Sequence, residues 1–245
     1  MIDGLILAFQ FLTRIPIPIA IDFNEKNHRI SNLYYGAVGL VLGGIYFSVY
    51  FLMSDFDPWI RALLITFLMA GFTGGLHLDG VSDTADGFFC GKSKEESYNI
   101  MKDSRVGTFG VLALFFLLSS KLIFIAKLSE PVALIIAAAN ARFAVPIFFV
   151  IGKSPSDKGL GSLEQKSVKP LYAIFPAVLY LSVLVIKKPI GAVSFLAVLF
   201  YMVVLRNMAY NKIGGVSGDI YGAFIEISEA LTLLIFILMK SGGSI

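Results

Sequence analysis

The chain alternates long apolar stretches with shorter polar ones from residue 33 to residue 239. Seven of the apolar stretches have roughly 17 to 21 residues, and about 20 such residues are needed to cross the hydrocarbon core of a bilayer. The pattern therefore predicts an all-α, polytopic integral membrane protein with about seven transmembrane helices, in which residues 1–245 form a single domain. The predicted spans cover residues 33–53, 58–78, 107–126, 131–151, 170–186, 189–205 and 223–239.

An eighth apolar stretch, residues 4–21, differs from the others because Arg14, Pro16 and Pro18 interrupt it. Proline removes a backbone donor and favours extended geometry in the residue before it. We therefore expect a half-helix or an interfacial segment at the N-terminus and not an eighth full span.

Composition agrees with this class and excludes several others. Hydrophobic residues make up 57% of the chain, and the mean hydropathy is +0.80. The net charge of +3 is small and scattered, so a nucleic-acid partner is not expected. The single cysteine, Cys90, excludes an internal disulfide and a cysteine-based zinc cluster. The N-terminus lacks a basic region, so we expect no cleavable signal peptide.

Basic residues outside the spans predict the orientation of the chain in the membrane. If the chain alternates sides, the side that carries the N-terminus holds thirteen lysines and arginines and the other side holds five. The positive-inside rule makes the first side cytoplasmic. The three long polar loops, 79–106, 152–169 and 206–222, all fall on this side, so the chemistry is expected to face the cytosol.

The stretch GGLHLDGVSDTADGFF (74–89) gathers scarce carboxylates directly after an apolar run. Asp79, Asp83 and Asp86 are spaced i, i+4 and i+7, which on a helix places them within an arc of about 60°. Three such charges repel one another unless a cation lies between them, and Mg²⁺ prefers oxygen ligands of this kind. The spacing favours a magnesium site over a solvated acidic loop. His77 is a catalytic candidate beside it or a packing residue, and Thr84 is a candidate substrate contact.

A second polar stretch, IMKDSRVGTFG (100–110), precedes the third span. Lys102 and Arg105 could offset phosphate charge, although they could equally be anchors of the positive-inside kind. Asp103 is a candidate base or further metal ligand, and Ser104 is a candidate substrate contact.

The fourth span contains Asn140 and Arg142 near its middle, and Lys121 lies inside the third. An arginine at the bilayer centre costs about 2.5–3.5 kcal/mol on insertion scales, so it should face a polar cavity or a carboxylate partner. Asn140 and Arg142 are therefore candidate substrate contacts, with a structural ion pair as the alternative for Arg142 and for Lys121.

Acids gather once more in GGVSGDIYGAFIEISE (214–229), at the start of the last span. Glu226 and Glu229 share a helix face. Asp219 is a candidate substrate contact.

Taken together, these stretches resemble the cobalamin synthase family, the adenosylcobinamide-GDP ribazoletransferases. The resemblance covers most of the chain. It is carried by FLTRIPIP near the start, GGLHLDGVSDTADGFF, IMKDSRVGTFGVLAL, GLGS at 159–162 and GGVSGDIYGAFIEISE.

The resemblance implies an integral enzyme of the prokaryotic inner membrane that requires Mg²⁺. Such an enzyme joins adenosylcobinamide-GDP to α-ribazole or its 5′-phosphate and releases GMP. The resemblance is also compatible with a homo-oligomer or with a complex with other cobalamin-assembly enzymes. On this hypothesis Asp79, Asp83 and Asp86 hold Mg²⁺ on the diphosphate, Asp103 completes the metal shell or acts as base, and Lys102 and Arg105 stabilise the leaving GMP.

Two other functions fit the sequence less well than this one. A CDP-alcohol phosphotransferase would continue the D-G-x-x run with Ala-Arg, where this chain has Asp83-Thr84. A cation-coupled transporter would place its acids near mid-span, whereas most of these lie at span ends.

Overall fold

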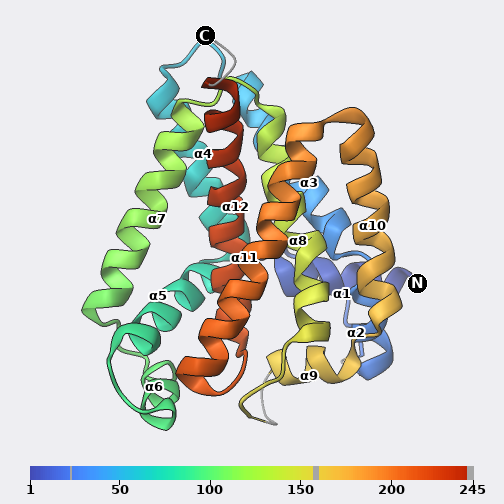
Figure 1. The fold of residues 1–245 in the computed structure, drawn as a ribbon. Coiled ribbons are helices and arrows are strands. Elements are labelled where there is room, and N and C mark those ends of the chain that lie inside the picture. Colours follow the sequence, from blue (N-terminus) through green and yellow to red (C-terminus); the bar gives the residue numbers. More distant parts are fainter. Residues whose placement is uncertain (23, 157–159, 242–245) are drawn as a thin grey trace.

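The structure is a computed structural model, and it describes residues 1–22, 24–156 and 160–241. All regular secondary structure in these residues is helical, in twelve helices (Figure 1). Six helices are long and apolar enough to cross a membrane. They are α3 (Tyr35–Leu52), α7 (Thr108–Ala126), α8 (Val132–Ile151), α10 (Pro170–Lys187), α11 (Pro189–Ile213) and α12 (Gly218–Ser241). The prediction of a polytopic, all-α protein is confirmed.

The second predicted span, 58–78, is not one straight helix. It is α4 (Pro58–Thr73) followed by α5 (Leu76–Phe89), and the two helix axes are bent by 88°. The break falls at Gly74 and Gly75, whose φ angles of 61° and 73° lie in the left-handed region that glycine adopts without steric strain. The predicted span was therefore wrong at its end, and the acidic stretch lies beyond the bend.

The N-terminal stretch contains a helix too short to span. Helix α1 (Ile2–Leu12) has 11 residues, and the chain continues without regular structure from Thr13 to Asp22. The side chain of Gln10 donates hydrogen bonds to the carbonyls of Ile17 and Ile19, which fold this segment back along the helix. The prediction of a half-helix is confirmed.

Helix α8 runs through the centre of the bundle and packs closely on α3. A Cβ atom at Gly39 would lie 2.6 Å from the carbonyl oxygen of Ala138, and one at Gly43 would lie 2.5 Å from Cα of Ile135. Small residues allow helix backbones to approach in this way where a bilayer offers no hydrophobic drive between helices.

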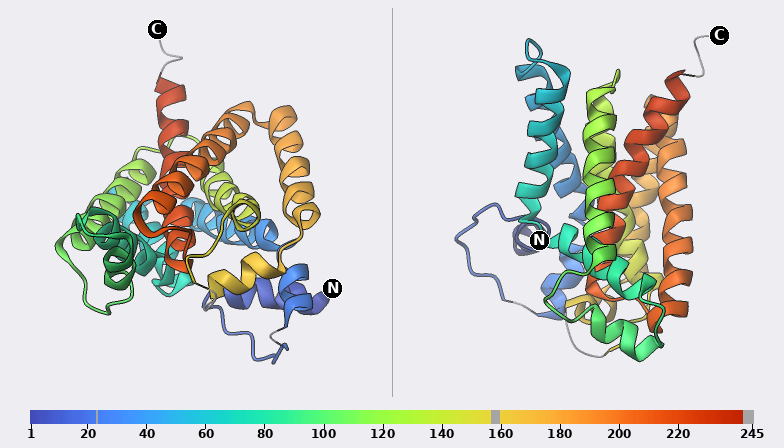
Figure 2. Two further views of the ribbon diagram at one scale, coloured as in Figure 1. Left: turned by 60° about the horizontal axis from the view of Figure 1, so that its bottom comes forward. Right: turned by 90° about the vertical axis from the view of Figure 1, so that its left-hand side faces the viewer.

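The polar connections meet at one end of the bundle. Figures 1 and 2 show α5, the short helices α2 (Glu25–Ser31), α6 (Lys94–Ile100) and α9 (Leu160–Ser167), and the turn between α11 and α12 at this end. We refer to it as the loop end. Segments more than 100 residues apart in sequence therefore share one surface, and α9 packs against α2 there.

Candidate active site

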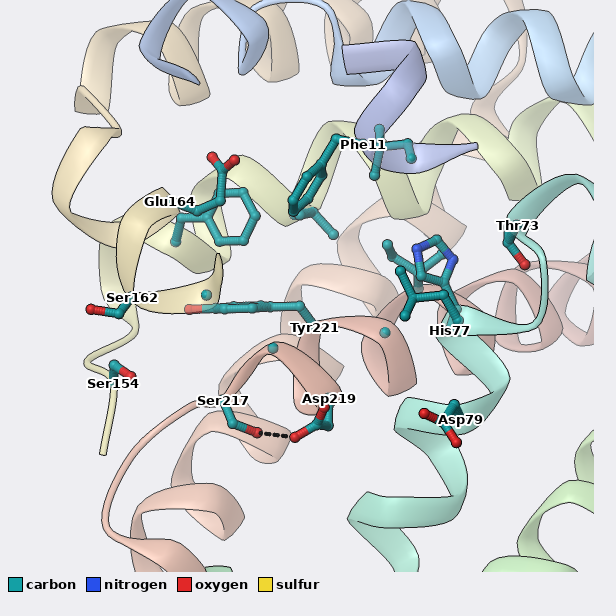
Figure 3. A pocket seen from close by; sticks show the side chains of 18 of the residues that line it. Phe11, Thr73, His77, Asp79, Ser154, Ser162, Glu164, Ser217, Asp219 and Tyr221 are labelled. Carbon is teal, nitrogen blue, oxygen red and sulfur yellow. Dashed lines mark hydrogen bonds between the residues drawn. The ribbon is translucent and has the colours of Figure 1, made fainter. Parts of the chain in front are cut away.

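A cavity of about 790 Å³ opens at the loop end, between α1, α5, α8, α9 and α12. Its volume falls within the range of about 300–1,000 Å³ that is usual for small-molecule sites. Four of the candidates from the sequence line it, namely His77, Asp79, Lys102 and Asp219. Figure 3 shows side chains from several helices facing this space.

One side of the cavity is acidic and contains a single paired cation. Nζ of Lys102 lies 2.9 Å from Oδ2 of Asp219, and the Ser217 hydroxyl donates to the same oxygen at 3.2 Å. Burial lowers the pKa of Lys102, but the hydrogen bond and the charge of Asp219 outweigh this and raise it overall. Lys102 therefore carries its charge at neutral pH.

Asp83 lies one helical turn after Asp79 on α5, beyond the bend and outside the six spanning helices. Burial and then the charges of Asp79 and Asp219 raise the pKa of its carboxyl to about 7, against the lowering effect of Lys102. Three carboxylates thus face one lysine, and this excess of negative charge favours a cation. We call Asp79, Asp83, Asp219 and Lys102 the acidic side; Asp79, Asp219 and Lys102 line the cavity, and Asp83 interacts with them without lining it.

The start of α12 lies directly against α5 at this point. A Cβ atom on Gly80 would lie 2.4 Å from the carbonyl oxygen of Asp219. Only glycine leaves room for this approach. Gly80 therefore brings the aspartates of the two helices to the same side of the cavity.

Asp86, the third aspartate of the predicted metal face, is directed elsewhere. Its carboxylate accepts hydrogen bonds from the backbone N–H groups of Gly107 at 2.7 Å and Gly110 at 2.9 Å, and the residue is 8% exposed. A carboxylate there satisfies donors of the first turn of α7 and complements the helix dipole. Within the described ranges, no three His, Cys, Asp or Glu side chains lie close enough together to hold a metal by themselves.

Asp103, Ser104 and Arg105 follow Lys102 but do not line the cavity. Nη2 of Arg105 lies 2.5 Å from Oδ2 of Asp103, and the Arg105 side chain is 87% exposed. Hydrogen bonds from Arg105 lower the pKa of Asp103 to about 2. The two charges neutralise each other at the surface, and Ser104 is exposed beside them.

His77 and Thr84 occupy different surroundings on α5. His77 lines the cavity, and its Nδ1 lies 3.9 Å from Oε1 of Glu226, which is beyond hydrogen-bond distance. Thr84 is buried, its hydroxyl has no hydrogen-bond partner, and it is not among the residues that line the cavity.

Two acids and two bases form a buried ion network inside the spanning helices. Lys121 on α7 lies 2.5 Å from Glu226 and 2.7 Å from Glu229, both on α12. Nη1 of Arg142 on α8 lies 2.5 Å from Oε1 of Glu229 and also donates to the carbonyl of Ala138. The expectation of a carboxylate partner for Arg142 is confirmed, and the two pairs of charges balance.

Asn140 is fully buried in a separate polar cluster. Its amide nitrogen donates to Ser194 at 2.9 Å and to Thr232 at 3.1 Å, and its oxygen accepts from the Tyr180 hydroxyl at 2.8 Å. Neither Asn140 nor Arg142 lines the cavity. The structure does not bring these two candidates to the others, and their role as substrate contacts stays a prediction.

Several cavity residues were not anticipated from the sequence, and Glu164 and Arg14 are the charged ones. Oε1 of Glu164 lies 2.5 Å from Nδ1 of His28, and Oε2 accepts from the Asn32 amide at 3.2 Å. Arg14 lies across Gly74 at the bend. The scarcity of acids between residues 131 and 218 could have drawn attention to Glu164. The proximity of Arg14 depends on the bend, which was not predicted.

Comparisons with known proteins place the chain in one family. The family model described as cobalamin-5-phosphate synthase matches residues 4–237. Relatives named adenosylcobinamide-GDP ribazoletransferase include that of Thermoanaerobacter pseudethanolicus, 34% identical over 96% of this chain and 97% of its own. Others are from Caldanaerobacter subterraneus, 36% identical over 96% and 98%, and Brevibacillus brevis, 40% identical over 94% and 96%. No solved structure matches the chain.

Proposed function

Because the chain belongs to the cobalamin-5-phosphate synthase family, we propose that the cavity at the loop end is its active site. The protein is an adenosylcobinamide-GDP ribazoletransferase of the late part of cobalamin biosynthesis. The observation that carries the proposal is that three family motifs supply Asp79, Lys102 and Asp219 to one cavity.

In the reaction, a ribose hydroxyl of α-ribazole or its 5′-phosphate attacks the phosphorus next to the cobinamide arm. A new P–O bond forms, the bond to the GMP phosphate breaks, and the hydroxyl proton is lost. Positioning and charge neutralisation carry most of the catalysis in phosphoryl transfer. The protein therefore needs anion-stabilising groups for the diphosphate and a carboxylate close to the hydroxyl.

The acidic side suits Mg²⁺ by the chemistry of its donors. Asp79, Asp83 and Asp219 are carboxylates with one lysine among them, and burial together with their repulsion raises the pKa of Asp83. Mg²⁺ commonly takes only one or two carboxylates and completes its shell with water and substrate phosphates, so three preformed ligands are not required. When bound, Mg²⁺ would neutralise charge on the diphosphate oxygens.

The remaining roles follow from which side chains line the cavity. Lys102 is charged and stands beside Asp219, so it stabilises phosphate oxygens of the departing GMP. Asp79 or Asp219, which line the cavity, can take the hydroxyl proton in place of Asp103, which does not. Asp86 anchors α7 and supports the site from outside.

The enzyme is oriented with its loop end toward the cytosol in this proposal. The excess of lysine and arginine in the loops on that side supports it, as does the cytosolic origin of nucleotide substrates. The six spanning helices and α4 would then lie in the prokaryotic inner membrane, with α5 at its cytosolic face.

Purified protein in detergent tests the proposal directly. The protein is incubated with adenosylcobinamide-GDP and α-ribazole, with Mg²⁺ or with a chelator, and GMP and the cobalamin product are separated by chromatography. We expect equal amounts of both products only with Mg²⁺ and nucleoside present. Absence of product with both α-ribazole and its 5′-phosphate would overturn the proposal.

A further inference from the structure

One stretch that resembles the family has no role in the proposed chemistry. The stretch FLTRIPIP (11–18) supplies Arg14 to the lining of the cavity. The Arg14 side chain lies over Gly74, where a Cβ atom would come within 2.4 Å of its Cγ and 2.9 Å of its Nε. The backbone N–H of Arg14 donates to the carbonyl of Phe72 at 2.7 Å. Arg14 is therefore held at the bend between α4 and α5.

Arg14 is a cation without a carboxylate partner. Among the described residues, Arg14 and Lys102 are the arginine and lysine side chains that line the cavity, and Lys102 is paired with Asp219. Arg14 forms no ion pair within the part of the chain that the structure describes, and this includes Asp79, the acid in the first turn of α5. A guanidinium fork that no carboxylate occupies matches the oxygens of a phosphate.

His77 is a second unsatisfied group close to the bend. It lines the cavity, and only 6% of it is exposed. Neither nitrogen of its ring forms a hydrogen bond within the described ranges, and Nδ1 is buried. Buried polar groups usually have a partner, because leaving them unpaired is costly. A ligand with acceptor oxygens would provide a partner for the imidazole N–H.

The start of α5 adds the donors of a helix N-terminus to this place. No side chain caps this 14-residue helix, and Leu76 and His77 of its first turn line the cavity. The N–H groups of an uncapped first turn and the helix dipole both favour an anion such as a phosphate. We call Arg14, His77 and the first turn of α5 the bend subsite.

The bend subsite is separate from the acidic side. Gly75 precedes Gly80, against which the carbonyl of Asp219 packs, by five residues, or about 7.5 Å along a helix axis. In Figure 3, Thr73 and His77 lie apart from Ser217 and Asp219. The two phosphates of the donor share one bridging oxygen, so both belong with Mg²⁺ and Lys102. A phosphate at the bend must instead be joined to the reacting group through further atoms, such as those of a ribose.

We infer that the bend subsite binds the 5′-phosphate of α-ribazole 5′-phosphate, while a ribose hydroxyl of the same molecule reaches the acidic side. This inference rests on the proposed function. It makes Arg14 the residue that selects the phosphorylated acceptor over α-ribazole. It also gives the N-terminal half-helix a role, because this helix and the residues after it carry Arg14 to the bend.

The test measures the KM of each acceptor in Arg14→Gln. Lys26→Gln, which removes an exposed cation of the loop end outside the cavity, is the matched control. A hydrogen bond to a charged group corresponds to a factor of about 10 to 150 in affinity. We expect the KM of the wild type to be at least tenfold lower for α-ribazole 5′-phosphate than for α-ribazole, and Arg14→Gln to lose this preference.

The KM values for α-ribazole and for adenosylcobinamide-GDP should stay within twofold in Arg14→Gln, and Lys26→Gln should change none of the three. Arg14→Lys keeps the charge without the fork and should recover part of the preference.

Four results would overturn the inference while leaving the proposed function intact. They are an equal KM for the two acceptors in the wild type, an unchanged preference in Arg14→Gln, an equal rise for both acceptors, and a rise confined to adenosylcobinamide-GDP. The third would give Arg14 a structural role, and the fourth would put it on the diphosphate. Absence of product from the wild type with both acceptors would count against the proposed function instead.

Calorimetric titration with α-ribazole 5′-phosphate, in the absence of the donor, tests the subsite without turnover. In a detergent free of phospholipid, the affinity should fall at least tenfold in Arg14→Gln, and lipid phosphate cannot cause that fall. An effect of Arg14→Gln that appears only in phosphatidylglycerol vesicles would assign Arg14 to a lipid head group and overturn the inference.

Discussion

The buried ion network and the acidic side of the cavity both combine carboxylates with basic side chains. They differ in whether the negative and positive charges are equal in number. In the network, Glu226 and Glu229 meet Lys121 and Arg142, and all four are almost completely buried. On the acidic side, three carboxylates share one lysine, and Lys102 and Asp219 stay partly exposed.

This difference separates two uses of charge in a membrane protein. A neutral network satisfies itself and holds α7, α8 and α12 together, so it needs no ligand. An unbalanced cluster in a cavity is incomplete without a cation or a cationic substrate group. Burial beside a membrane is therefore a poor guide to function unless the partners of each charge are known.

The largest predicted effect is on the stability of the protein, when one carboxylate of the buried ion network is removed. Glu229→Gln leaves the charges of Lys121 and Arg142 with one carboxylate, and removing one partner of a buried pair usually costs about 3–5 kcal/mol. We expect the free energy of unfolding in mixed micelles to fall by this amount, with exposed Glu95→Gln as the unchanged control. A fully stable Glu229→Gln protein without turnover would instead connect the network to the chemistry.

Asp83→Asn should lower turnover without lowering stability, the opposite of what we expect for Glu229→Gln. The amide keeps the shape of the side chain but removes charge from the proposed magnesium site, so turnover should fall about 100-fold or more. Unfolding should be no easier than in the wild type, because a repelling charge is lost. GMP release is the measurement, and Asp55→Asn, an exposed aspartate beyond the far end of α3, is the control. Normal turnover would remove Asp83 from the site.

Asp86→Ala distinguishes an anchor from a metal ligand. Loss of a side chain that accepts from a helix N-terminus costs about 0.5–2 kcal/mol. We expect a loss of this size in the free energy of unfolding, with less than a tenfold fall in turnover. A drop as large as that of Asp83→Asn, in a stable protein, would return Asp86 to the magnesium site as the sequence suggested.

Arg105→Ala should have the smallest effect. The exposed pair with Asp103 contributes little to stability, since solvent screens the attraction between charges at the surface. Turnover should stay within threefold of the wild type, whereas Lys102→Ala, three residues earlier, should lower it about tenfold. A tenfold loss in Arg105→Ala would mean that this loop closes over the substrate.

Much of the fold could be predicted from the sequence because apolar length is a local property. Six spans and the N-terminal half-helix were predicted near their observed positions. The bend at Gly74 and Gly75 was missed because the apolar run continues across it, although a glycine pair before a polar stretch favours a break. Where an element ends depends on two backbone angles that hydropathy does not report.

The candidate site was less predictable because the direction of a side chain and its bonding partners depend on tertiary packing. The i, i+4, i+7 spacing correctly put three aspartates on one helix, yet Asp86 lies where α7 begins and α7 provides better donors than the cavity. Glu164 and Tyr221 reach the cavity only through the packing of α9 and α12. Tyr221 lies within the stretch 214–229 and Glu164 is a rare acid in its region, but neither signal shows which side chains face the cavity.

The early end of α4 has a consequence for the lipids around the enzyme. Its 16 residues rise about 24 Å, which is shorter than the hydrocarbon core of about 30 Å. Leu63 and Phe67 on α4 are exposed, so this helix faces acyl chains directly. Such a mismatch is relieved by thinning of the bilayer, at fractions of a kcal/mol per ångström. We therefore expect the bilayer to be thinned beside α4, and membranes of shorter acyl chains to accommodate this helix with less strain.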